Sequence, residues 1–168
     1  RKSIDRGHTV AGVMFGSKRL HDFAHNNRQL EFRSCAYTHG AGVLAQIEHF
    51  VALNSAVEVD LSGQINAEVA AGVYVGGVGG AGDFLRAAQH SKGGLPIVAL
   101  PSTAGRHSRI VARLGGPVST PRSDACIIVT EYGVADLRGA GLAERARRML
   151  AIAHPDQREL LEHDSRVA

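Results

Sequence analysis

The stretch AGVYVGGVGGAGDFLRAAQH, residues 71–90, places a glycine cluster between an apolar run and a helical pattern. The run Ala71–Val75 predicts a strand, and Asp83–His90 predicts a helix. Five of the seven residues from 76 to 82 are glycine, more than a tight turn needs. Without Cβ atoms, the backbone N–H groups of such a loop can close on a ligand oxygen. The stretch therefore predicts a strand–loop–helix unit of an α/β protein whose loop holds an anion or a developing oxyanion.

The spacing Gly77-x-Gly79-x-x-Gly82 also matches the fingerprint of dinucleotide-binding domains. That fingerprint includes an acidic residue about 20 residues further on, at the end of the next strand. The next apolar strand, Pro96–Leu100, runs instead into Pro101-Ser102-Thr103, and residues 84–123 contain no Asp or Glu. Nicotinamide or flavin binding is therefore disfavoured, and a purely structural turn is the other alternative.

Composition is typical of a soluble α/β domain. The 168 residues fit a single domain, 1–168, with a sizeable core, and no apolar stretch has the length of a membrane span. Aromatic residues make up only 5%, so the core must consist of Ala, Val, Leu and Ile, which suits a parallel sheet. The net charge of +3 is not clustered with aromatic residues, so neither nucleic acid nor membrane is an expected partner.

Cysteine and histidine usage predicts neither disulfides nor a metal site. Cys35 and Cys126 are far apart and match no zinc-binding spacing, so we interpret them as buried thiols in a reducing, cytoplasmic compartment. The nine histidines include no HExxH pair, and His21 and His25 lack a third ligand in sequence. The first residues have no initiator Met and no signal-peptide core, which suggests a piece of a longer chain.

The remaining patterns predict an open, mostly parallel sheet flanked by helices, with a β-hairpin near residues 57–68. In that hairpin, Ser62-Gly63 is the turn, and Glu58 and Asp60 are expected on a solvated face. Strands are predicted over Val10–Phe15 (buried), Phe50–Leu61, Pro96–Leu100, Ile110–Val111 and Cys126–Thr130. Helices are predicted over Lys18–Asn27, Ala41–Glu48, Asp83–His90, Leu142–Ala153 and Pro155–His163.

Glu131 directly follows the run Cys126–Thr130, which has the length and β-branching of a central strand. Ligands of open α/β sheets bind at the carboxyl ends of the strands. A carboxylate there can orient a substrate or transfer a proton, although pairing with a nearby arginine is equally ordinary. Arg106 and Arg109 lie in a loop rich in Ser, Thr and Gly and are candidates for holding phosphates, with plain surface charge as the alternative. No serine lies in a GxSxG elbow, so a serine nucleophile is not expected.

Four segments in order resemble one known family. They read FGSKRL (15–20), NSAVEVDLSGQ (54–64), GVGG followed by DF (77–84) and VTEYGVADLRG (129–139). This pattern is similar to the C-terminal half of the acetyl-CoA hydrolase/transferase family, which includes 4-hydroxybutyrate, butyrate:acetate and succinate:acetate CoA-transferases. The similarity runs from about Ser3 to Leu160.

The resemblance implies a domain that packs against a similar N-terminal half, with the active site between them and a homodimer or larger homo-oligomer as the assembly. The substrates would be acyl-CoA and a short-chain carboxylate, with no bound cofactor. A glutamate of the enzyme attacks the thioester, and exchange through an acyl-glutamyl anhydride gives an enzyme–CoA thioester. The resemblance makes Gly77, Val78, Gly79 and Gly80 the oxyanion and thioester-binding loop, with Gly79 and Gly80 catalytic donors, and Glu131 the auxiliary glutamate.

Two departures accompany the resemblance. The family's nucleophilic glutamate lies upstream of the stretch that corresponds to Ser3, so we expect the 168 residues alone not to turn over acyl-CoA. At Tyr37-Thr38-His39-Gly40, relatives usually carry an Asn-Asp or Asn-His pair, and Ala81 replaces a frequent Gln or Ser. Hydrolysis of acetyl-CoA and a non-catalytic binding or assembly domain therefore stay as alternatives to CoA transfer.

Overall fold

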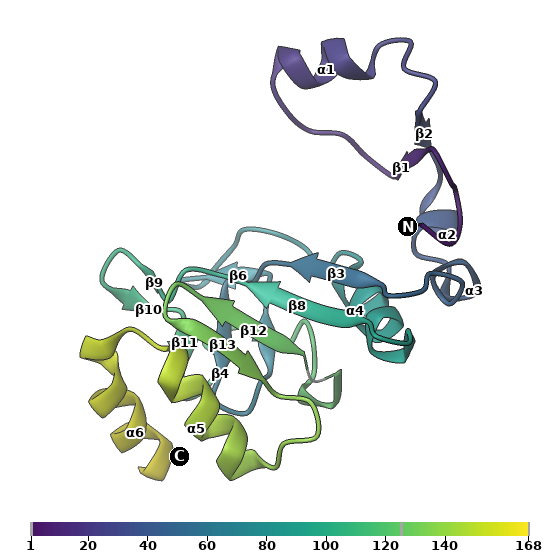
Figure 1. The fold of residues 1–168 in the computed structure, drawn as a ribbon. Helices are drawn as coiled ribbons and strands as arrows, with labels where there is room; N and C mark the ends of the chain where they lie inside the picture. The colour runs from purple at the N-terminus through teal and green to yellow at the C-terminus, as the bar shows by residue number, and fades with distance from the viewer. Residues whose placement is uncertain (1, 125, 168) are drawn as a thin grey trace.

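The computed structural model describes residues 2–124 and 126–167, and its centre is a four-stranded sheet of order β13-β12-β8-β3 (Figure 1). The strands β3 (Val51–Asn54), β8 (Leu95–Ala99) and β12 (Ile127–Thr130) run parallel. The edge strand β13 (Gly133–Asp136) pairs antiparallel with β12. The central strands have short, apolar sequences. This is expected because the side chains of strands in the middle of a mostly parallel sheet are buried. The predicted open, mostly parallel sheet is confirmed.

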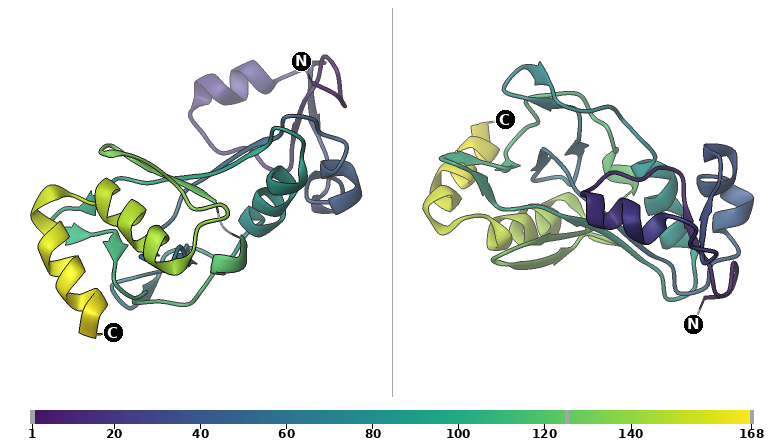
Figure 2. Two further views of the ribbon diagram at one scale, coloured as in Figure 1. Left: turned by 60° about the horizontal axis from the view of Figure 1, so that its bottom comes forward. Right: turned by 90° about the horizontal axis from the view of Figure 1, so that it is seen from above.

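The two faces of this sheet differ in what covers them. Helices α4 (Ala81–His90) and α5 (Leu142–Ile152) pack on one face, where Val98, Ile128 and Ala135 lie in register and are buried. The alternating side chains point to the other face. Helix α1 (Lys18–Ala24) of the N-terminal segment is seen in front of this face in Figure 2 (right), but Figure 1 shows that it stands away from the sheet. We call this face the bare face, and it is mainly apolar. Its apolar side chains are Val51, Leu53, Leu95, Ile97, Ala99, Ile127, Val129 and Val134, and Asp136 lies on the same face opposite Ile127.

A smaller sheet contains the predicted hairpin. In it, β4 (Glu58–Asp60) pairs antiparallel with β5 (Ile65–Asn66) and parallel with β11 (Ile110–Val111). Gly63 in the turn has a φ of +92°, and a Cβ there would lie 2.7 Å from Leu137 Cδ1. Only glycine combines that backbone conformation with that packing. The hairpin near residues 57–68 is confirmed.

The prediction that the side chains of Glu58 and Asp60 face solvent is wrong at Asp60. Its side chain is buried, and Oδ1 accepts hydrogen bonds from the backbone N–H groups of Ser62 and Gln64, each at 2.9 Å. A buried carboxylate must be paired in this way, because desolvation without partners is costly. Asp60 therefore has a structural role, as expected, but it has this role as a buried residue and not on a solvated face.

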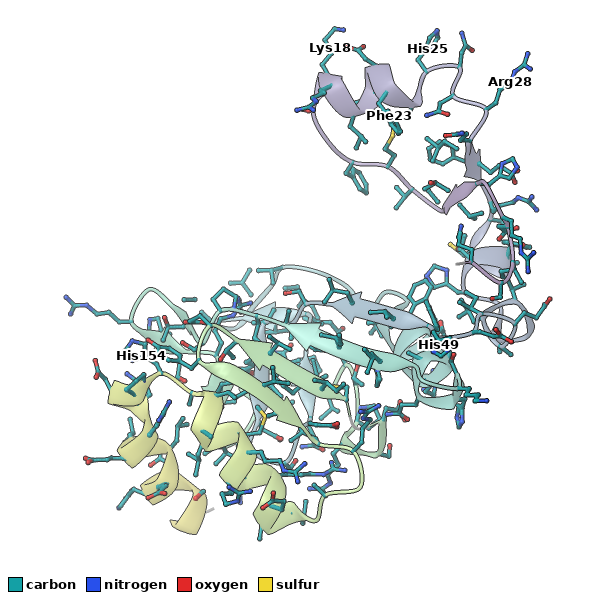
Figure 3. The ribbon with its side chains drawn as sticks, viewed as in Figure 1. Lys18, Phe23, His25, Arg28, His49 and His154 are labelled. Carbon is teal, nitrogen blue, oxygen red and sulfur yellow. The ribbon has the colours of Figure 1, made fainter. Side chains whose placement is uncertain are left out.

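Residues 2–34 form an arm that projects from the body of the molecule (Figure 1). It contains β1 (Thr9–Ala11) paired in parallel with β2 (Leu30–Phe32), and α1 (Lys18–Ala24). The buried strand Val10–Phe15 is a wrong prediction, because β1 ends at Ala11 and Phe15 is 86% exposed. Phe23, labelled on α1 in Figure 3, is also exposed. Apolar spacing predicted burial here, but the described part of the chain leaves both phenylalanine side chains exposed.

The other elements are short, apart from the last helix, which has 10 residues. They are α2 (Cys35–Thr38), α3 (Ala41–Leu44), β6 (Val69–Ala70), β7 (Val73–Tyr74), β9 (Thr103–Ala104), β10 (His107–Ser108), the 3-10 turns Arg122–Asp124 and Pro155–Gln157, and α6 (Arg158–Val167). Both cysteines are free, but Cys35 is exposed, contrary to the prediction. Cys126 is buried, and this burial raises the pKa of its thiol to about 12. Among the described residues, no helix combines the length and apolarity that crossing a membrane requires.

Candidate active site

The glycine loop, residues 76–80, connects the β6–β7 hairpin to α4. The predicted strand Ala71–Val75 is confirmed only over β7 (Val73–Tyr74), because Ala71 and Gly72 adopt positive φ values of 49° and 77° and form a turn. The strand that follows, β7, pairs only with β6 and lies outside the main sheet. A dinucleotide fingerprint needs its glycines directly after a strand of the main sheet. The local fold therefore supports an anion loop of another kind.

The amides of the glycine loop are available to a ligand. Just before it, the N–H groups of Val75 and Gly76 donate to the carbonyl of Glu68. Within residues 2–124 and 126–167, the next three N–H groups, those of Gly77, Val78 and Gly79, find no acceptor, and these residues are exposed. The loop also leads into the N-terminus of α4, where the helix dipole favours negative charge. It is thus a set of free donors at a positive helix end.

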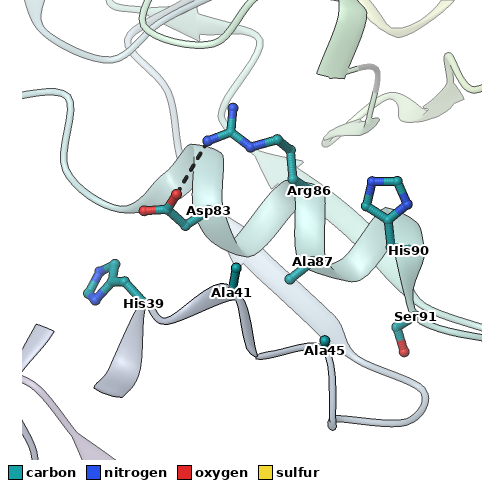
Figure 4. Close-up of a pocket in the computed structure, with 8 residues that line it drawn as sticks. All are labelled: His39, Ala41, Ala45, Asp83, Arg86, Ala87, His90 and Ser91. Carbon is teal, nitrogen blue, oxygen red and sulfur yellow. Dashed lines mark hydrogen bonds and ion pairs between the residues drawn. The ribbon is translucent and has the colours of Figure 1, made fainter. Parts of the chain in front are cut away.

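His39 packs directly against the glycine loop. A Cβ built on Gly80 would lie 2.0 Å from both Cδ2 and Nε2 of the His39 ring. The ring also stacks at a tilt on Phe84 of α4, with 4.7 Å between centroids, and Nδ1 lies 2.8 Å from Thr38 Oγ1. Figure 4 shows His39 opposite the first turn of α4, beside a cavity of about 430 Å³ between α3 and α4. Gly80 is required here because any side chain would displace the imidazole.

Glu131 lies at the carboxyl end of β12, as predicted, and Ser102 holds it. The Ser102 hydroxyl donates to Oε1 at 2.6 Å, and the Ser102 N–H donates to Oε2 at 2.8 Å. These bonds, the hydroxyl first, lower the pKa of the Glu131 carboxyl, with a smaller contribution from His154. Glu131 is otherwise exposed. The site therefore presents an oriented, ionised carboxylate to solvent.

Sequence reasoning missed Ser102 as the partner of Glu131. The signal was present, because Pro101-Ser102-Thr103 follows β8 after a single residue, Leu100, and β8 is the parallel neighbour of β12. Carboxyl ends of adjacent parallel strands meet at one edge of a sheet. Ser102 itself is buried, and its hydroxyl is already used in the hydrogen bond to Glu131.

The two predicted arginines differ in what they contact. Arg106 lies exposed in the turn between β9 and β10. Arg109 is half-buried, and its guanidinium donates to the carbonyls of Val57, at 2.7 Å, and Ala56. Part of its donor set is thus already used within the fold. In the described part of the chain, no group of three or more His, Cys, Asp and Glu residues is placed to hold a metal.

The structure brings the predicted site residues into two clusters. One joins the glycine loop to His39 and Phe84, and the other joins Glu131 to Ser102. No hydrogen bond or ring contact between described residues links the two. The first half of α4 contacts the segments that precede β3 and β12, since the Phe84 ring lies 6.3 Å from the Phe50 ring and Arg86 pairs with Asp124, whereas Glu131 follows the carboxyl end of β12. Only an extended ligand could contact both the glycine-loop cluster and the Glu131 cluster.

Fold and site together define a mixed α/β domain with an exposed loop of N–H donors and an ionised carboxylate at a strand end. Free N–H donors and a fixed carboxylate are groups that can stabilise or orient charge that develops during a reaction. The sequence model of the acetyl-CoA hydrolase/transferase C-terminal domain matches residues 16–165, and the chain belongs to this family.

Individual relatives agree with this assignment. The 4-hydroxybutyrate coenzyme A transferase of Clostridium kluyveri is 43% identical over 96% of this chain, which covers 38% of that protein. The solved 4-hydroxybutyrate CoA-transferase of Porphyromonas gingivalis is 42% identical, with a TM-score of 0.81 over 99% of this chain and 39% of its own. RipA from Yersinia pestis is 37% identical, with a TM-score of 0.87 over 99% of this chain and 37% of its own. The chain spans about two fifths of the length of these relatives.

Proposed function

We propose that this chain is a single domain, the C-terminal domain of an enzyme that transfers coenzyme A between short-chain carboxylic acids. One observation carries the proposal: the exposed N–H groups of the glycine loop have no acceptor within the described residues, and the loop is held by His39 at a helix N-terminus. Free donors arranged in this way stabilise the oxyanion of a thioester under attack. The family and the names of its relatives support the same chemistry.

In this proposal the chain supplies oxyanion stabilisation rather than the nucleophile. A glutamate from polypeptide outside residues 1–168 attacks the thioester carbonyl, the C–S bond breaks, and an acyl-glutamyl anhydride forms. The CoA thiolate then attacks the glutamyl carbonyl and releases the first acid as a carboxylate. A second carboxylate takes the CoA by the reverse sequence. Gly79 and Gly80 donate to each oxyanion, and the charge of Glu131 orients the reacting groups.

Binding of the CoA substrate extends this proposal to further residues. The N–H groups of Gly77 and Val78 hold the thioester end, and the exposed Arg106 is placed to meet a phosphate. Arg109 contributes through its remaining donors, since its guanidinium also supports the Ala56 and Val57 carbonyls. The free thiols of Cys35 and Cys126 support a reducing, cytoplasmic location.

The test uses the complete enzyme, meaning this chain joined to the remaining polypeptide that its relatives carry. We expect acetyl-CoA to be consumed only when an acceptor acid is present, and an enzyme–CoA adduct that borohydride or hydroxylamine destroys. The isolated 168 residues should consume none. Loss of acetyl-CoA without an acceptor would support the hydrolase activity that the family name also contains. Absence of any adduct would contradict both activities and favour a binding domain.

We further propose that the remaining polypeptide packs on the bare face. Leu53 is 68% exposed and Val134 65% exposed in this chain, although parallel sheets are normally covered on both sides. About three fifths of the length of the relatives lies outside the part that this chain matches, which is enough to form the covering layer. Copies of the complete enzyme would then assemble through other surfaces, as a homodimer or larger homo-oligomer.

Leu53→Glu tests that interface. We expect it to leave the unfolding temperature of the isolated chain within about 2 °C, because exposed substitutions change stability by only about 0.5 kcal/mol. In the complete enzyme the same charge becomes buried, so the unfolding temperature should fall by about 5 °C or more. Leu160→Glu, on the exposed side of α6, is the matched control. Equal effects of Leu53→Glu in both proteins would contradict the interface.

A further inference from the structure

A second cavity of about 440 Å³ lies where the arm meets α2, α3 and α4, and we call it the arm cavity. Its lining is mainly apolar and comes from four parts of the chain. It includes Val10, Val13, Val43, Leu44, Ile47 and Phe84. Cavities of this size and composition are typical of small-ligand sites.

The polar groups in this lining are mostly paired with other protein groups. Tyr37 donates its hydroxyl to Asp5 at 3.0 Å, and Ser3 donates its hydroxyl to the carbonyl of Gln46 at 2.8 Å. In the described chain, the Nε2 atom of His39 has no hydrogen-bond partner, since only Nδ1 meets Thr38. The cavity thus offers mainly apolar walls, and its lining includes the His39 ring, whose Nε2 lies against Gly80.

His39 also connects the arm cavity to the glycine loop. Its ring lines the cavity, touches the position where a Gly80 Cβ would lie, and stacks on Phe84. A ligand whose carbonyl oxygen receives the loop amides therefore has its adjoining atoms next to this ring. Beyond the ring, the space available to them is apolar.

We propose that the arm cavity binds the hydrocarbon chain of the acyl group, and so selects acids longer than acetate. The inference rests on the proposed function, because it takes the thioester carbonyl to lie at the glycine loop. In this proposal His39 stands between the reacting carbonyl and the hydrocarbon chain, and Val43 of α3 and Gly12 of the arm both line the cavity. The substrates are then unbranched or cyclic apolar carboxylic acids of several carbons.

Two substitutions change the size of the cavity in opposite directions. Val43→Ala removes two methyl groups from the α3 wall and should favour longer acids. Gly12→Leu adds a side chain to the arm wall, where the nearest atom to a new Cβ is Thr38 Oγ1 at 3.4 Å, so the backbone accepts it. Val118→Ala, on an exposed segment away from both clusters, is the matched control for the valine change.

The experiment measures kcat/KM of the complete enzyme with acetate, butyrate and hexanoate as acceptors. A methylene in an apolar pocket changes discrimination by about 10-fold or more. We expect Val43→Ala to raise the hexanoate-to-acetate ratio about 10-fold, and Gly12→Leu to lower the butyrate-to-acetate ratio at least as much. Val118→Ala should leave both ratios unchanged. In methyl NMR of the 168-residue chain, hexanoate should shift the signals of Val43, Leu44 and Ile47.

The possible failures are distinguishable. If every variant transfers CoA to acetate with unchanged ratios between acids, the arm cavity is not the acyl site, and the proposed function stands. If hexanoate shifts no methyl signal lining the cavity, the inference is equally contradicted. If the unsubstituted complete enzyme transfers CoA to no acid, the proposed function fails, and the inference fails with it.

Discussion

Replacing Gly80 by alanine should lower kcat/KM of the complete enzyme about 100-fold and destabilise the chain. The new Cβ would lie 2.0 Å from the His39 ring, so the ring must leave Gly80 and Phe84. Overpacking of this kind costs about 1–3 kcal/mol, which for a chain of this size is roughly 2–12 °C in unfolding temperature. Displacing the donors by about 1 Å costs about 100-fold in rate. Thermal unfolding and steady-state kinetics measure the two effects.

A double substitution separates the clash from other causes. His39→Ala removes the ring, so Gly80→Ala should cost little stability in that background, and the two changes should be strongly non-additive. Gly77→Ala is the control for stability, because a Cβ at that position would have no atom beyond its chain neighbours within 4 Å and the φ of Gly77 is not positive. If Gly80→Ala costs the same with and without His39, the imidazole does not position the loop.

Glu131→Gln should lower kcat about 100-fold while leaving stability nearly unchanged. The amide has the shape of the carboxylate but no charge, and its NH₂ group cannot accept the hydrogen bond from Ser102. Removing a group that assists proton transfer or charge stabilisation typically costs 10²–10⁴-fold, so about 100-fold is the expected minimum. Glu131 is exposed, so its loss should hardly affect unfolding. Glu159→Gln, exposed on α6, is the control.

Replacing Ser102, the hydrogen-bond partner of Glu131, should change the pH dependence of kcat. The Ser102 hydroxyl is the main cause of the lowered Glu131 pKa, so Ser102→Ala should raise that pKa toward its ordinary value. The carboxylate is then protonated at a higher pH as acid is added. The acidic limb of the kcat profile should therefore move to higher pH. An unmoved limb, together with full activity of Glu131→Gln, would remove Glu131 from the reaction.

Some parts of this fold could be predicted because their cause is local. The run Cys126–Thr130 is apolar and β-branched, and β12 forms there with Glu131 at its end. Ser62-Gly63 predicted a hairpin turn, and the positive φ of Gly63 forms it. The helices near 83–90 and 142–153 follow their apolar spacing. In each case, neighbouring residues contain the whole signal.

Other predictions were wrong because the same local sequence pattern can occur in a buried segment or in an exposed one. Phe15 and Phe23 lie in segments whose apolar pattern predicted burial, yet both are exposed on the arm, because the described residues leave them uncovered. Cys35 has apolar neighbours and is exposed for the same reason. Ala71–Val75 has strand composition, but a turn at Ala71-Gly72 places it in a separate hairpin.

By itself, the sequence determined the class of fold, the family, the donor-rich glycine loop and the carboxylate at the end of a strand. Only the tertiary structure decided that Ser102 holds Glu131 and that His39 braces Gly80. These pairs lie 29 and 41 residues apart in the chain, and their contact depends on how strands align and how α4 packs. Local patterns determine which backbone forms, whereas long-range packing determines which side chains meet.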